Sequence, residues 1–150
     1  AGNSPSLSSA PDRPAWDDAD ERARRLFDAI VHDDPERAMD FFFPREAFLI
    51  VKGIQDPGRY YDRLLARYLQ DIHDLHENTE GLSEAEFVRL DLNRRGGWVG
   101  VREEGNRLPY WASRHSHIIY RVGEEERRLE VRVLITWDAC WYVIHLSEFR

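Results

Sequence analysis

Three side chains in the C-terminal part of the chain have the residue types needed to bind an anion and to move a proton. His117, Arg132 and His145 lie in segments where apolar and polar residues alternate, the pattern of half-buried β-strands. With a four-residue turn at 123–126 and a two-residue turn at 138–139, antiparallel pairing places Arg132 between the two histidines. Two imidazoles beside a guanidinium suit a carboxylate or phosphate ligand, with His117 or His145 as a general base if the protein is an enzyme. The alternative interpretation is a solvent-facing polar row or part of a dimer interface.

Arg114 is the fourth candidate ligand-binding residue. Alternation places it on the apolar face of its strand, together with Ile118 and Tyr120. Because an unpaired charge is costly on such a face, we expect Arg114 either to pair with a carboxylate from a helix or to line the mouth of a pocket and meet an anionic ligand. Six aromatic side chains suit the wall of a pocket or the core equally well, and these are Tyr60, Trp98, Tyr110, Trp111, Trp137 and Trp141.

The sequence predicts no metal site and no cofactor. His115 and His117 have a spacing that zinc and iron sites use, but Arg132 in the middle of the row would repel a cation. Glu130 is the one carboxylate near a possible fourth ligand position. The chain also has no phosphate loop, dinucleotide-binding fingerprint or nucleophile elbow.

Composition limits the classes of partner. The 150 residues carry a formal net charge of −7, with a pI near 5.4, which argues against a nucleic-acid or anionic-membrane surface. Cys140 is the single cysteine, so no intrachain disulfide is possible. No apolar run approaches the roughly 18 residues needed to span a bilayer. Of the 21 basic residues only Lys52 is a lysine, a skew that is typical of a GC-rich genome.

The first fourteen residues differ from the rest. Residues 1–14 are rich in Ser and Pro and poor in apolar side chains, so we expect a flexible tether, followed by one domain over 15–150. A Ser/Pro-rich start resembles that of a mature exported protein or lipoprotein. Export or lipid anchoring and a cytoplasmic location therefore both stay open.

Hydrophobic periodicity predicts helices first and strands afterwards. Asp34-Pro35 and Asp56-Pro57 each place a capping residue before a proline, the arrangement of a helix start. After Gly81 the apolar period changes from 3.6 to 2. The predicted helices cover 17–31, 35–43 and 57–77, with a short strand at 47–51, and the later strands cover 87–93, 98–102, 110–122, 128–137 and 140–149.

This order of elements resembles the nuclear-transport-factor-2-like (cystatin-like) cone fold. The resemblance covers 17–149 and rests on the element order, on the helix from Asp34-Pro35 to Phe43-Pro44 and on the terminal strand at 141–146. It implies an α+β fold in which three N-terminal helices pack in a strongly curved antiparallel sheet, with an apolar pocket between them. Relatives include ketosteroid-isomerase-like and dehydratase-like enzymes, ligand binders and dimerisation modules, so the fold does not select a function.

The pocket expected from this resemblance favours a non-catalytic role. Enzymes of this shape place an Asp/His or Tyr/Asp set in the pocket, whereas the predicted inward face here carries no Asp, since Asp91 alternates away from it. We therefore expect a small-ligand-binding or dimerisation domain that takes an apolar or anionic molecule. The alternative is a small isomerase, hydrolase or dehydratase that uses a pocket His/Arg pair.

The other face of the predicted sheet is expected to be uncovered. That face would carry large apolar side chains, which are Trp111, Ile119, Leu134, Trp141 and Val143. So much exposed apolar surface predicts a homodimer formed by two sheets packed back to back.

Overall fold

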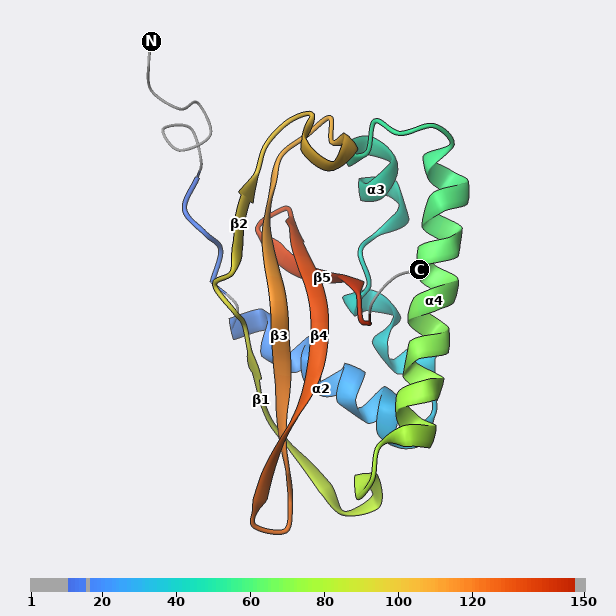
Figure 1. Ribbon diagram of the computed structural model, residues 1–150, viewed down its shortest axis with the longest axis vertical. Coiled ribbons are helices and arrows are strands. Elements are labelled where there is room, and N and C mark those ends of the chain that lie inside the picture. Colours follow the sequence, from blue (N-terminus) through green and yellow to red (C-terminus); the bar gives the residue numbers. More distant parts are fainter. Residues whose placement is uncertain (1–10, 16, 148–150) are drawn as a thin grey trace.

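Helices occupy the first half of the chain and strands the second, as Figure 1 shows. The computed structural model describes residues 11–15 and 17–147. Its helical segments are α2 (Asp17–His32), the 3₁₀ helix η1 (Pro35–Phe41), α3 (Arg45–Val51), α4 (Pro57–Asn78) and the short η2 (Leu82–Glu84) and η3 (Glu103–Gly105). The strands are β1 (Ala85–Asp91), β2 (Gly96–Val99), β3 (Tyr110–Val122), β4 (Glu125–Trp137) and β5 (Cys140–His145). The α+β class, with helices preceding an antiparallel sheet, is therefore confirmed.

The long helix α4 forms where the sequence periodicity predicts it. The Asp56 side chain accepts a hydrogen bond from the backbone N–H of Arg59 at 3.3 Å, and Pro57 occupies the first turn. One face of the helix buries Tyr61, Leu64, Tyr68, Asp71 and Ile72. None of the described helices has the length and apolar character needed to cross a bilayer.

The predicted strand at 47–51 is wrong, because these residues lie in helix α3. Pro44 precedes the helix, and its carbonyl accepts from the N–H of Phe48 at 3.0 Å. Ala47, Phe48 and Val51 are buried on one side of the short helix. A five-residue apolar run does not distinguish a strand from a short buried helix.

The sheet is antiparallel and its strands follow the order β1-β3-β4-β5, with β2 also paired to β3. In Figure 1 the sheet forms one side of the molecule and α4 runs along the other, while α2 passes behind β3 and β4 toward α4. Phe42, directly after η1, forms a parallel bridge to Val143, and the Phe43 N–H donates to the Val143 carbonyl at 2.9 Å. The helical half is thus joined to β5 at this point.

The predicted row of His117, Arg132 and His145 does not form. Val122 pairs with Glu125, so the turn between β3 and β4 has two residues instead of four, and His117 lies opposite Glu130. Between β4 and β5 the register shifts at Val133, which places His145 opposite Val133 instead of Arg132. A difference of two residues at one turn and a bulge at the other strand pair are enough to separate the three side chains.

A second irregularity lies in β3, beside Val133 of β4, where the β4–β5 register shifts. His115 has a φ of +58°, and the Oγ atoms of Ser113 and Ser116 are 2.8 Å apart although residues three apart normally point to opposite faces of a strand. The chain therefore exchanges faces between these serines. Arg114 and Tyr120 consequently lie on different faces, which corrects the single apolar face predicted for β3.

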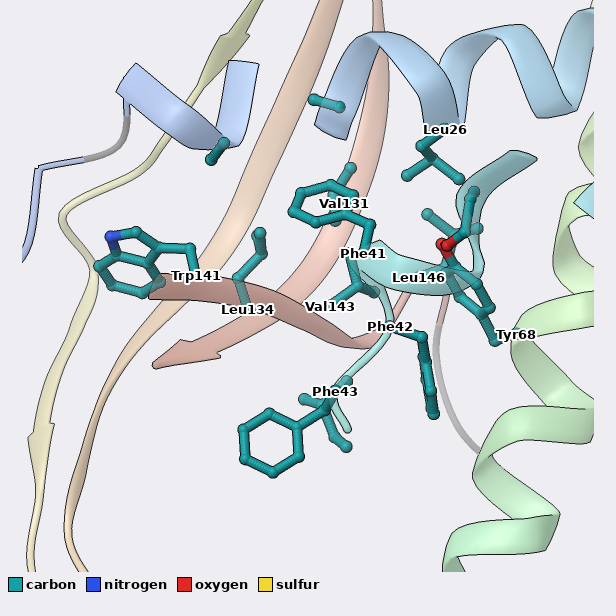
Figure 2. Close-up of a cluster of buried hydrophobic side chains, with 14 of the residues drawn as sticks. Leu26, Phe41, Phe42, Phe43, Tyr68, Val131, Leu134, Trp141, Val143 and Leu146 are labelled. Atoms are coloured by element: carbon teal, nitrogen blue, oxygen red, sulfur yellow. The ribbon is translucent and has the colours of Figure 1, made fainter. Parts of the chain in front are cut away.

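The sheet face expected to be uncovered is covered within the chain. Ile119, Leu134, Trp141 and Val143 are each 2% exposed or less, and Trp111 is half-buried. Figure 2 shows Trp141, Leu134 and Val143 from the sheet in one cluster with Phe41 of η1 and Leu26 of α2. This burial removes most of the exposed apolar surface on which the predicted homodimer rested.

Residues just before α2 also contact this side of the sheet. The indole Nε1 of Trp141 donates to the carbonyl of Pro14 at 3.2 Å. The Arg13 guanidinium lies 5.1 Å from the ring centroid of Trp111 and donates to the Arg94 carbonyl at 3.2 Å. Of the predicted tether, Arg13 and Pro14 thus contact the domain, whereas Pro11 and Asp12 are exposed and 1–10 lie outside the described residues.

Candidate functional site

A cavity of about 200 Å³ lies between the helices α3 and α4 and the strands β3, β4 and β5. It combines apolar walls with three nitrogen-bearing side chains. No Asp or Glu is among the described residues that line it. The lining residues are Phe48, Lys52, Tyr60, Leu64, Tyr110, Arg114, Val133, Ile135, Ile144 and His145.

The apolar walls come from all five elements and are well packed. Phe48 of α3 stacks on Tyr60 of α4, with the ring centroids 6.1 Å apart and the planes inclined by 7°. Leu64 follows Tyr60 by four residues and therefore lies on the same helix face. Leu64 and Ile135 are each 2% exposed, so this part of the cavity is shielded from water by the fold itself.

Lys52 follows directly after α3 and brings the one lysine of the chain into the cavity wall. Its Nζ donates to Oδ1 of Asn106 at 2.6 Å and contacts Oη of Tyr110 at 3.1 Å. Nζ also lies 5.2 Å from the centroid of the Tyr110 ring. Asn106 is 3% exposed, and its Nδ2 has no hydrogen-bond partner among the described residues.

The backbone around Lys52 is held by the loop between β2 and β3. Lys52 and Asn106 form an isolated antiparallel bridge, the Gly53 N–H donates to the Gly105 carbonyl at 2.7 Å, and the Arg107 N–H donates to the Val51 carbonyl at 2.6 Å. Figure 1 shows this loop beside α3 at one end of the molecule. The loop therefore fixes the lysine at that end of the cavity.

Arg114 and His145 enter the cavity from the sheet. Arg114 pairs with Val133 and Val133 pairs with His145, so these three residues form a row across β3, β4 and β5 at the level of the bulges. Arg114 and Tyr110 lie four residues apart on β3 and share the face toward the cavity. The structure thus brings together Arg114 and His145, two of the four predicted ligand-binding residues.

The other two predicted residues, His117 and Arg132, are not among the residues that line this cavity. His117 pairs across the sheet with Asp91 on β1 and Glu130 on β4, and partial burial, with a smaller effect of Arg128, lowers its pKa. Glu130 also binds its neighbours, since its Oε2 lies 2.8 Å from Nδ1 of His115 and its Oε1 lies 3.5 Å from Nη1 of Arg132. Glu130 thus binds His115 and Arg132 beside His117 in a separate cluster on the sheet.

No group of three or more His, Cys, Asp and Glu side chains with an arrangement suited to a metal ion occurs among the described residues. Sequence reasoning missed Lys52, because the run before it was interpreted as a strand. The signal available in the sequence was that Lys52 is the one lysine among 21 basic residues. Of the six aromatic candidates for pocket walls, Tyr60 and Tyr110 line the cavity, whereas the four tryptophans are not among its lining residues.

Comparisons with known proteins show the fold alone. No family model matches the chain, and no curated protein matches it. The structure is similar to the crystal structure of a cystatin-like protein from Ruminococcus gnavus, with a TM-score of 0.56 and 16% sequence identity over 85% of this chain. The match covers 40% of that protein, so the chain spans less than half of its length. The chain therefore has a cystatin-like fold, which supports many unrelated functions.

Proposed function

We propose that the protein is a nuclear-transport-factor-2-like domain that binds a small organic anion with an apolar body in the cavity. The observation that carries the proposal is the composition of the cavity wall. Lys52, Arg114 and His145 share one compartment of about 200 Å³ with apolar side chains, and none of the described residues that line it is an Asp or a Glu. Ligand sites commonly combine apolar walls with a few placed polar groups in this way.

The volume limits the size of the ligand. An apolar cavity of about 150 Å³ is large enough to bind benzene. A cavity of about 200 Å³ therefore suits one ring with a short acidic side chain, or an unbranched acid of similar size. Pockets for drug-sized ligands are larger, at roughly 300–1,000 Å³.

The charges of the wall select an acid over a neutral molecule. A carboxylate that leaves water must find charged or hydrogen-bonding partners, and a guanidinium offers two parallel N–H donors. The net charge of −7 opposes the approach of an anion, but salt screens it beyond about 10 Å at 0.1 M ionic strength. Local contacts inside the cavity therefore outweigh the overall charge.

Calorimetric titration with phenylacetate and with its neutral analogue phenylacetamide tests the proposal. We expect saturable binding of the acid and much weaker binding of the amide. Arg114→Gln should weaken acid binding by roughly 10- to 100-fold, since hydrogen bonds to charged groups contribute about 1.5–3 kcal/mol. Arg132→Gln is the matched control, because it removes the same charge from the same sheet outside the cavity. Equal affinity for acid and amide, or equal effects of the two substitutions, would overturn the proposal.

A second candidate function is catalysis by a small enzyme of this fold. The observation that favours it is the contact of Lys52 Nζ with Tyr110 Oη at 3.1 Å inside the cavity, which brings together two groups able to transfer a proton. Arg114 and His145 in the same cavity form the His/Arg pair that such an enzyme would use to hold an acidic substrate. Turnover of an acid that the wild-type protein binds, and loss of that turnover in Lys52→Arg with binding retained, would support this candidate.

A further inference from the structure

We infer that Lys52 is an amine nucleophile and that the anion bound in the cavity is a small oxo acid, whose carbonyl carbon forms an imine with Nζ. This inference rests on the proposed anion site and adds to it a covalent step and a class of ligand. A lysine that forms an imine must lie inside a shielded site, next to a group that can exchange protons with it. Lys52 is half-buried at the wall of the cavity, and its Nζ lies 3.1 Å from the phenol oxygen of Tyr110.

The position of the amine is fixed from two sides. Asn106 accepts from Nζ at 2.6 Å, and the phenol oxygen of Tyr110 lies 3.1 Å from the same atom. The side chain of Asn106 is itself buried, at 3% exposure, and the loop that carries it is hydrogen-bonded to the end of α3. Holding a nucleophile in one place lowers the entropic part of a reaction barrier.

The proposed step balances as a condensation. The neutral Nζ attacks the carbonyl carbon of the oxo acid, and a proton moves from nitrogen to the former carbonyl oxygen to give a carbinolamine. The Tyr110 hydroxyl then donates a proton to the departing oxygen, water leaves, and the resulting iminium nitrogen returns a proton to the Tyr110 oxygen. One carbonyl and one amine thus become one imine and one water, without an oxidant or a reductant.

The rest of the cavity explains why the carbonyl compound should also be an acid. Lys52 lies at the end formed by α3 and the β2–β3 loop, whereas Arg114 and His145 enter from the sheet at the level of the bulges. A molecule with a carbonyl and a carboxylate can use both sets of groups at once. Leu64, Ile135 and other apolar side chains then surround its hydrocarbon part.

The competing interpretation is that Lys52 serves the fold alone. In that case its ammonium only ties the β2–β3 loop to α3 through Asn106. The amine would then bind no carbonyl compound covalently, even where an acid occupies the cavity. This interpretation is one outcome of the experiment below.

The experiment uses the full chain, phenylpyruvate as the oxo acid and phenyllactate as its hydroxy analogue. Each acid is incubated with the protein and sodium cyanoborohydride, which reduces an imine to a stable secondary amine. Peptide mapping by mass spectrometry then locates the adduct. We expect phenylpyruvate to modify Lys52, phenyllactate to bind without an adduct, and modification to rise with pH because only the neutral amine attacks. The single lysine makes the assignment clear, since the terminal amine is the other primary amine of the chain.

Two variants serve as controls. Lys52→Arg keeps a positive donor for Asn106 and should form no adduct at position 52. Tyr110→Phe keeps the amine and should slow adduct formation by roughly 10²-fold, the low end of what a positioned proton donor contributes. Melting temperatures of both variants establish that they are folded.

The outcomes separate this inference from the proposed function. Saturable binding of both acids without an adduct at Lys52, or an adduct at the terminal amine alone, overturns the inference and leaves the anion site intact. Failure of both acids to bind contradicts the proposed function as well. An unchanged rate in Tyr110→Phe overturns the proton-transfer role of the phenol.

Discussion

Filling the cavity should abolish ligand binding without destabilising the protein, and Val133→Phe is the substitution that does so. Val133 lies in the cavity wall, between Arg114 and His145 in the sheet. Since about 150 Å³ accommodates a benzene molecule, the added phenyl ring takes most of the roughly 200 Å³ available. Filling an existing cavity commonly stabilises a protein by about 0.5–2 kcal/mol. For a chain of this length each kcal/mol corresponds to a change in Tm of roughly 2–4 °C.

Val131→Phe on the same strand is the matched control. Val131 is 0% exposed and lies in the packed cluster of Figure 2, so the same enlargement has no space to enter. Overpacking a close-packed core costs about 1–3 kcal/mol. We expect thermal denaturation to show an unchanged or higher Tm for Val133→Phe and a lower Tm for Val131→Phe. Calorimetry should show loss of phenylacetate binding only for Val133→Phe. Equal destabilisation by the two substitutions would refute the reasoning that an open cavity lies beside Val133.

Three further predictions concern the fold that holds the cavity. Leu134→Ala, at a site that is 0% exposed, should lower the free energy of unfolding in urea by about 2–5 kcal/mol, and a loss below 1 kcal/mol would contradict the packing seen around it. His115→Gly should be more stable than His115→Ala by about 1 kcal/mol, because alanine is strained at a φ of +58° and glycine is not; equal stabilities would show that this bulge is absent in solution. The hydrogen bond and the charge of Asp33 raise the pKa of His73 in the folded protein. This pair should therefore stabilise the fold fully at a pH below the unfolded-state pKa of about 6.5. The stabilisation should disappear as the pH rises through the higher folded-state pKa. Comparison of the unfolding free energies of wild type and His73→Gln across this pH range measures the effect, and a difference that grows with pH would contradict the sign.

The element types followed from periodicity wherever the pattern was long. The helix predicted over 57–77 is observed as Pro57–Asn78, and the strand predicted over 110–122 has the same bounds in the structure. The prediction failed for 47–51, where five apolar residues fit a strand and a buried helix equally. It also failed for the covering of the sheet, since alternation within a strand does not indicate that α2 and η1 pack on the second face.

The sequence predicted two residues of the candidate site and missed a third. Arg114 and His145 do line the cavity, but the row joining His145 to His117 depended on the register of two strand pairs. A one-residue bulge moves all the following side chains of a strand to the other face of the sheet. Bulges leave no clear signal in the sequence. Lys52 reaches the cavity through contacts with Asn106 that are distant in the chain, so local patterns could not identify it.

The most direct test of the account is a heteronuclear NMR titration of the labelled protein with phenylacetate, with phenylacetamide as the reference. The account predicts saturable shifts of the backbone amides at Arg114, Val133, Ile135 and His145, caused by the acid and not by the amide. Amides of the separate cluster at His117 should stay unchanged. Shifts that do not saturate, that appear equally with the neutral amide, or that spread evenly over the sheet would contradict the central claim that this cavity is an anion-binding site.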